Sequence, residues 1–156
     1  MSKSGKMPAA GVSALARRRK IVEAVATFGL ILVAVGLAAP FVDMTDTAYL
    51  SMFKWVYAPG ALLFTVARVC DRPDPSEDMR VRRLRRMEFW AGVAFCIGAF
   101  FWFYNDDRYS RFLLSGVGAL TYLRETILFS LVGAFLQLIA SWMISYRLGK
   151  NRRERK

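Results

Sequence analysis

The chain has 156 residues and a formal net charge of +11 at pH 7, and 55% of its residues are hydrophobic. Its mean hydropathy of +0.28 arises from long apolar blocks rather than from scattered apolar residues. Each block spans about 18 to 23 residues, the length that a helix needs to cross the ~30 Å hydrocarbon core of a membrane. This pattern disfavours a single soluble domain. It also favours the positive-inside bias of membrane proteins over nucleic-acid binding as the origin of the charge.

The residue types that catalysis and metal binding most often use are scarce. The sequence contains no histidine, which is the commonest catalytic base and the commonest metal ligand. Cys70 lies at the inner end of one predicted span and Cys96 inside another, so no disulfide framework is indicated. No phosphate loop, dinucleotide fingerprint or catalytic triad is recognisable. We therefore predict no catalytic residues, no cofactor and no bound metal.

Residues 1–20 are predicted to be a basic mobile tail, and residues 21–42 the first membrane span. The four cations at residues 17–20 followed by an apolar run superficially resemble a secretory signal peptide. However, the run is longer than a typical signal sequence, Pro40 makes its end a poor cleavage site, and further spans follow. We expect this segment to remain as a transmembrane helix.

A short polar turn at residues 43–47 leads into the second predicted span, residues 49–69. Pro59 lies near its middle, where it removes a backbone donor and crowds the carbonyl of Trp55, so a kink is expected. Kinks of this kind serve as hinges in transporters, but membrane helices also tolerate proline without a functional role. The second interpretation is favoured.

Prolines in the loop at residues 70–76 stop the second span, and Ser76 is predicted to cap the next helix. That helix begins as a basic juxtamembrane segment, residues 77–86, and continues as the third span, residues 87–104. An outer loop is expected at residues 105–111. The arginines of the juxtamembrane segment are expected to contact anionic lipid headgroups: Arg80, Arg82, Arg83, Arg85 and Arg86.

Residues 112–123 are apolar but too short to cross a membrane. We expect an outer interfacial or re-entrant segment there, followed by the fourth span at residues 126–146; a continuous helix projecting from the bilayer is the alternative. A basic tail, residues 147–156, is expected to fray. All 23 Lys and Arg residues except Lys54, Arg108, Arg111 and Arg124 then lie on one side. The sequence thus predicts an all-α, four-helix transmembrane bundle with both termini cytoplasmic.

Ionisable side chains within the spans are candidate functional residues, because burying a charge in a membrane is costly. Glu23 and Glu88 lie within about one turn of the inner interface, near the basic residues 17–20 and 82–86, and are expected to pair with them. Lys54 is expected to extend outward along its span, toward Asp43 or Asp46. Interfacial pairing is favoured over proton coupling, since a coupling carboxylate is expected nearer the midplane.

Small and polar residues recur at spacings of three and four along the spans, a pattern that allows helices to approach closely. Gln137 is the strongly polar residue nearest the centre of the fourth span. The small and polar residues are Ser130, Gly133, Ala134, Gln137 and Ser141 on the fourth span, Ala91, Ala94 and Gly98 on the third, and Gly29, Ala34, Gly36 and Ala38 on the first. Packing within one bundle is favoured over self-association.

Three stretches carry a resemblance: Arg-Leu-Arg-Arg-Met-Glu-Phe-Trp-Ala-Gly at 83–92, Cys-Ile-Gly-Ala-Phe-Phe-Trp-Phe-Tyr at 96–104, and Leu-Val-Gly-Ala-Phe-Leu-Gln-Leu-Ile-Ala-Ser-Trp-Met-Ile at 131–144. They resemble a group of small bacterial four-span inner-membrane proteins, and the resemblance covers most of the chain beyond the first tail. It implies a location in the bacterial inner membrane, and it implies no activity.

Together these features predict a non-enzymatic accessory or scaffold protein that acts by helix packing within the bilayer. Its expected partners are membrane lipids with anionic headgroups on the cytoplasmic side, and either another membrane protein or further copies of this chain; no nucleic acid is expected. The alternative is a small homo-oligomeric transporter or channel subunit, in which Pro59 is a hinge, Gln137 lines a path and Glu23 or Glu88 titrates.

Overall fold

The computed structural model describes residues 9–42, 47–71, 79–111 and 123–154. Within these ranges the chain forms four long helices, α1 (Ala9–Val42), α2 (Thr47–Cys70), α3 (Met79–Arg111) and α5 (Arg124–Glu154). Each contains a stretch long and apolar enough to cross a membrane: Arg17–Ala38, Tyr49–Cys70, Val81–Asn105 and Arg124–Arg147. The predicted all-α bundle of four potential membrane helices is confirmed.

Three of the helices are longer than the sequence analysis expects. Of the tail expected at residues 1–20, the part from Ala9 onward is helical, and the expected fraying tail at residues 147–156 is helical as far as Glu154. The outer loop expected at residues 105–111 is the last part of α3. Alanine, leucine, lysine and arginine favour helix at the first two places, and no glycine or proline interrupts α3 after Gly98. The segment 112–122 lies outside the described residues.

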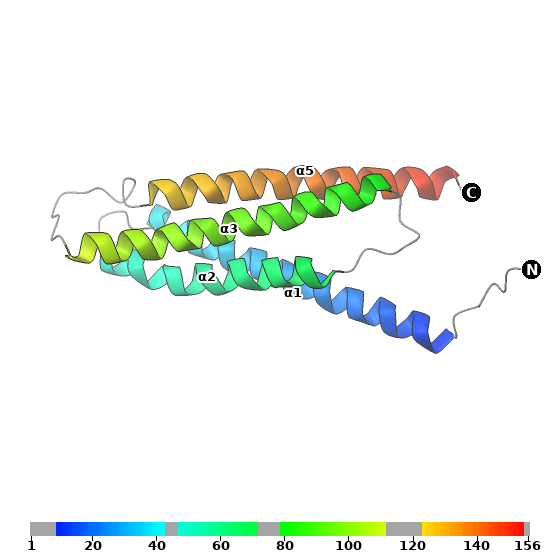
Figure 1. Ribbon diagram of the computed structural model, residues 1–156, viewed down its shortest axis with the longest axis horizontal. Helices are drawn as coiled ribbons and strands as arrows, with labels where there is room; N and C mark the ends of the chain where they lie inside the picture. The colour runs from blue at the N-terminus through cyan, green and yellow to red at the C-terminus, as the bar shows by residue number, and fades with distance from the viewer. Residues whose placement is uncertain (1–8, 43–46, 72–78, 112–122, 155–156) are drawn as a thin grey trace, which may run out of the picture.

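The four helices form two antiparallel hairpins. α1 packs along α2 and α3 packs along α5, and the hairpins meet through α2 and α3 (Figure 1). α1 begins and α5 ends at the same end of the bundle, on the right in Figure 1, where α2 ends and α3 begins. We call this the basic end, because it carries the cations at residues 17–20 and the arginines that begin α3. There the first turns of α1 diverge from the other helices.

Glycines let the backbones of α1 and α2 approach closely. A Cβ atom on Gly29 would lie 2.7 Å from the Phe64 nitrogen and 2.8 Å from the Gly60 carbonyl oxygen, and one on Gly60 would lie 2.8 Å from the Gly29 carbonyl oxygen. Gly36 makes a similar approach to Tyr57, whose Cβ would lie 2.7 Å away. Any side chain at these positions would force the helices apart, since the nearest atoms belong largely to the opposing backbone.

The predicted packing face of the first span is only partly correct. Gly29 and Gly36 are buried against α2, whereas Ala34 and Ala38 are exposed. Successive helical residues are rotated by about 100°, so positions seven apart share a face while Ala34 and Ala38 lie on the opposite side. The faces predicted on the third and fourth spans pack together: a Cβ on Gly133 would lie 2.8 Å from Phe95 Cε1 and 3.0 Å from the Ala91 carbonyl oxygen.

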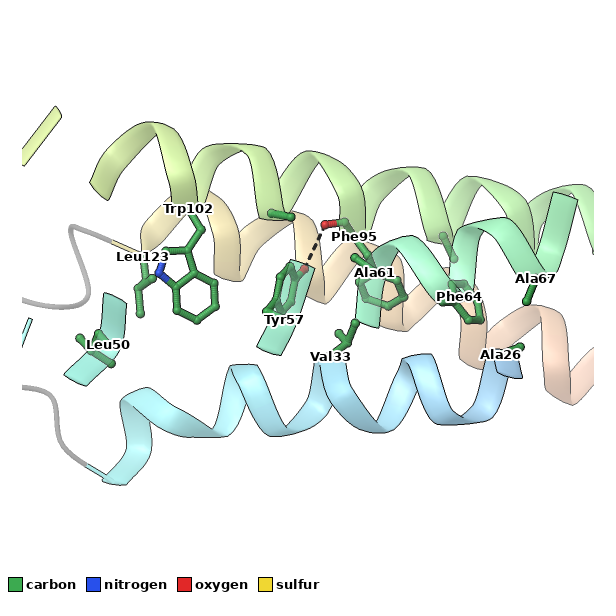
Figure 2. Close-up of a cluster of buried hydrophobic side chains, with 12 residues drawn as sticks. Ala26, Val33, Leu50, Tyr57, Ala61, Phe64, Ala67, Phe95, Trp102 and Leu123 are labelled. Atoms are coloured by element: carbon green, nitrogen blue, oxygen red, sulfur yellow. Dashed lines mark hydrogen bonds between the residues drawn. The ribbon is translucent and has the colours of Figure 1, made fainter. Parts of the chain in front are cut away.

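Aromatic side chains fill the space between the hairpins. Figure 2 shows Tyr57 and Phe64 of α2 between α1 and α3, with Phe95 and Trp102 of α3 beside them. The ring centroids of Tyr57 and Trp102 lie 5.5 Å apart, and those of Phe64 and Phe95 lie 5.7 Å apart. The Phe64–Phe95 pair is edge-to-face, an arrangement that contributes about 0.5–1.5 kcal/mol beyond the area that it buries. This core holds α2 against α3 and so positions the polar residues described next.

Candidate functional site: a polar seam between the hairpins

Two ion pairs join α2 to α3 at the basic end. Arg68 Nη1 lies 3.2 Å from Glu88 Oε2, and Arg85 Nη1 contacts Asp71 Oδ2. Arg68 lies on α2 and Asp71 directly follows the last residue of that helix, where its backbone nitrogen still donates to the Ala67 carbonyl. Arg85 and Glu88 lie on α3. In both segments the cation and the acid are three residues apart, which places both on one face. Because the two segments run in opposite directions, the order Arg68 then Asp71 matches Arg85 then Glu88. We call these four residues the charge clamp.

The clamp is largely shielded from solvent. The side chains of Glu88 and Asp71 are 6% and 10% exposed, and those of Arg68 and Arg85 are each 14% exposed. The Arg68 guanidinium carbon also lies 5.3 Å from the centroid of the Phe64 ring, within range of a cation–π contact. An ion pair in such a setting is strongly destabilised when one partner is removed, because the other charge is left buried and uncompensated.

A chain of hydrogen bonds extends the clamp from α3 to α5. Ser141 Oγ donates to Glu88 Oε1 at 3.5 Å, a long contact, and Gln137 Nε2 donates to Ser141 Oγ at 3.0 Å. Gln137 Oε1 is buried and accepts no hydrogen bond from any described residue. This series of hydrogen bonds therefore leads from the ion pair toward the middle of the span. It ends at Gln137, whose side-chain oxygen receives no hydrogen bond from the described residues.

A second group of hydrogen bonds ties the same three helices together further from the basic end. The Tyr57 hydroxyl of α2 donates to the Phe95 carbonyl of α3 at 3.2 Å (Figure 2). It also lies 2.6 Å from Ser130 Oγ of α5, and either hydroxyl can be the donor in that contact. Ser130 donates to the Thr126 carbonyl at 2.6 Å, and Thr126 Oγ1 donates to the Gly98 carbonyl at 3.1 Å. We call the charge clamp, the chain through Ser141 and Gln137, and this hydroxyl group the polar seam.

Replacing Tyr57 by phenylalanine is expected to lower the free energy of unfolding by about 1 kcal/mol, because interhelical hydrogen bonds in membrane proteins each contribute that order of energy. Ser130 keeps its bond to Thr126, so no donor is stranded. Thermal unfolding of the detergent-solubilised protein measures the change. Tyr104→Phe is the matched control, since Tyr104 is exposed on α3. An equal effect of both substitutions would contradict a structural role for the Tyr57 hydroxyl.

Several residues that the sequence nominates separately are brought together in the seam. Glu88, Ser130, Gln137 and Ser141 all belong to it. However, the expected pairing of Glu88 with residues 82–86 is corrected, because its ion-pair partner is Arg68 on α2. The nearest arginine on its own helix, Arg85, turns to Asp71 instead. Glu88 is therefore a contact between the hairpins rather than a contact within one helix.

The remaining ionisable candidates lie outside the seam. Glu23 pairs with Arg19, one turn before it, at 3.7 Å, and both side chains are exposed. Such pairs contribute little to stability. Lys54 Nζ lies 5.3 Å from the centroid of the Phe103 ring and 5.9 Å from that of Trp55. The acids that were expected to attract it, Asp43 and Asp46, lie outside the described residues.

Pro59 is exposed, and α2 continues through it from Thr47 to Cys70. The arginines that begin α3 divide between two surroundings: Arg83 and Arg86 are exposed, whereas Arg82 and Arg85 are half-buried. The side chain of Arg80 lies outside the described residues. Arg83 and Arg86 are thus the arginines of this segment whose side chains face outward.

Sequence reasoning missed Tyr57, Thr126, Arg68 and Asp71 as members of the seam. Tyrosine and threonine within a span give no signal of their own, because either can face lipid or a neighbouring helix. The two charged residues did have a signal in the sequence. A cation is followed three residues later by an acid twice, at Arg68 and Asp71 and again at Arg85 and Glu88. When two such segments pack side by side in opposite directions, the cation of each segment faces the acid of the other.

Among the described residues, no group of three or more cysteine, aspartate or glutamate side chains is placed to hold a metal ion. The seam offers hydrogen bonds and two pairs of opposite charges. Comparison with protein-family models, with curated protein sequences and with solved structures finds no match to this chain.

Proposed function

We propose that the protein is a non-enzymatic accessory or scaffold protein that acts by helix packing within the bilayer. The observation that supports this most is the use made of the polar side chains inside the spans. Glu88, Ser130, Gln137 and Ser141 contact other side chains or backbone of the same bundle, and the contacts of Glu88 and Ser130 bridge helices. Groups committed to joining helices favour a structural role over a role as the lining of a path.

The proposed location is the inner membrane of a bacterium, with both termini cytoplasmic. The positive-inside bias supports this orientation, because the cations at residues 17–20 and the arginines of α3 gather at the end where α1 begins and α5 ends (Figure 1). Exposed Arg83, Arg86 and Trp90 lie at helical spacing on one face of α3. Arginines beside an interfacial tryptophan are suited to anionic headgroups. The resemblance to small bacterial four-span proteins supports the same location.

The face proposed to meet a partner lies on α5. Leu131, Val132, Phe135 and Leu136 line an open apolar groove there, and Leu131 and Phe135 are largely exposed. In a membrane, a groove between side chains allows a second helix to pack by van der Waals contact. A transmembrane helix of another protein is the partner that the accessory role requires.

Substituting the groove is expected to release that partner without unfolding the chain. A tagged copy extracted in mild detergent should retain a foreign membrane protein in fixed ratio, as measured by native mass spectrometry. In the double variant Leu131→Ala with Phe135→Ala, the amount of retained partner should fall at least about 10-fold. A 10-fold change corresponds to about 1.4 kcal/mol of binding free energy. Phe100→Ala is the control, an equally exposed aromatic on α3. Recovery of this chain alone would contradict the accessory role.

The alternative, a small homo-oligomeric transporter or channel subunit, is favoured by one observation, the burial of Glu88 beside Arg68 within a span. Ionisable groups in that position are common in transport pathways. Proteoliposomes that contain the purified chain would carry an ion or solute under this alternative. Under the accessory role they stay tight.

A further inference from the structure

We propose that Glu88, with Arg68, Ser141 and Gln137, is a proton-binding site, and that binding a proton releases the end of α2 from α3 at the basic end. This inference rests on the contacts of the seam and holds whether the protein is an accessory protein or a transporter. Its ligand is a proton taken from water. The Glu88 carboxylate gains an O–H bond, and the charge of the clamp rises from zero to +1.

The surroundings of Glu88 give its carboxyl group a partner in each protonation state. When ionised, it faces Arg68 through Oε2 and accepts from Ser141 through Oε1. When protonated, it can donate to Ser141 Oγ, because a hydroxyl both donates and accepts. Ser141 can then donate to the carbonyl oxygen of Gln137 after its amide turns over. That oxygen accepts nothing from the described residues while Glu88 is ionised.

The Arg68 side chain can move away from Glu88 once the Glu88 carboxyl group is neutral. It lies two residues before the end of α2, and its side chain is 14% exposed, so a short movement brings the guanidinium to the interface. Its Nε atom is buried without a hydrogen bond to the described residues. A cation that has lost its counter-charge is destabilised inside the span, and moving outward removes that cost. The Arg68–Glu88 contact between α2 and α3 is then lost, and the Arg85–Asp71 pair is left as the ion pair of the clamp.

The other charged groups around Glu88 favour this response. Asp71, directly after α2, and Arg85 of α3 offset one another, and the contacts of α5 with Glu88 run through the neutral Ser141, to which Gln137 donates. α1 packs along α2. A proton on Glu88 thus leaves one unmatched positive charge between α2 and α3, while the hairpin of α3 and α5 keeps its glycine contacts.

Two measurements on the full chain in lipid nanodiscs test the proposal. Infrared difference spectroscopy between about pH 8 and pH 2, which brackets ordinary carboxyl titration, should show a protonated-carboxyl band. A component of that band should be absent from Glu88→Gln and present in Asp71→Asn. Spin labels on Cys70 of α2 and on Ser145→Cys of α5, in a Cys96→Ala background, should move apart as that band grows. In a background that lacks both Cys70 and Cys96, labels on Arg83→Cys and Ser145→Cys, both exposed and within one hairpin, should keep their distance.

Each outcome decides the question. In Glu88→Gln, the distance between the labels on Cys70 and Ser145→Cys should equal, at every pH, the longer distance that the unsubstituted Glu88 shows in acid. If that variant does not fold, Ser141→Ala replaces it: losing the donor to the carboxylate should shift the midpoint of both titrations. Three results would each overturn the proposal: a protonated-carboxyl band of unchanged size in Glu88→Gln, a titration midpoint that Ser141→Ala does not move, or a label distance that does not change when Glu88 is protonated.

Discussion

Replacing Arg68 by leucine is expected to lower the free energy of unfolding by about 3–5 kcal/mol at neutral pH, the usual cost of removing one partner from a buried ion pair. The substitution leaves the Glu88 carboxylate, which is 6% exposed, without its counter-charge inside the span. Equilibrium unfolding in mixed detergent measures the change. The loss should shrink as the pH is lowered, because a protonated Glu88 no longer needs the cation.

Two further variants separate the missing charge from the missing side chain. The double substitution Arg68→Met with Glu88→Leu should recover most of the stability, since replacing both members of a buried pair by apolar residues is often neutral. Arg19→Leu is the control, because its pair with Glu23 is exposed and should be worth less than about 1 kcal/mol. If Arg68→Leu were no more destabilising than Arg19→Leu, the clamp would not hold the hairpins together.

Replacing Gly29 by valine is expected to separate α1 from α2 and to cost about 3 kcal/mol or more, at the upper end of the range for overpacking. The new Cβ would lie 2.7 Å from the Phe64 nitrogen and 2.8 Å from the Gly60 carbonyl oxygen. Backbone atoms cannot turn aside as the end of a flexible side chain can, so the helices themselves must move. Thermal unfolding in detergent measures the loss of stability.

A matched substitution on the same helix controls for the change in residue type. Ala34 lies on the opposite face of α1 and is exposed. Ala34→Val should therefore change stability by no more than about 0.5 kcal/mol, as surface substitutions usually do. A disulfide trap between cysteines placed on α1 and α2 should form less readily in Gly29→Val than in Ala34→Val. Equal trapping in the two variants would show that α1 does not depend on this close approach.

The helices themselves could be predicted from the sequence because membrane spans depend on local composition. A run of apolar residues long enough to cross the bilayer must satisfy its own backbone hydrogen bonds, and a helix does so within the segment. The ends were harder to place. Residues 9–20 and 105–111 are helical beyond the predicted spans, because a helix that is already formed extends at little cost where no proline stops it.

The sequence by itself determined that four apolar helices form, that glycines and small residues mark packing faces, and that Glu88 and Gln137 are polar residues within spans. Only the tertiary structure decided the partners: Arg68 rather than residues 82–86 for Glu88, Tyr57 for Ser130, and an outward position for Ala34 and Ala38. The physical reason is that composition sets whether a segment enters the bilayer, whereas a contact depends on the rotation of one helix about its axis relative to another. That rotation is fixed by close packing between residues distant in sequence.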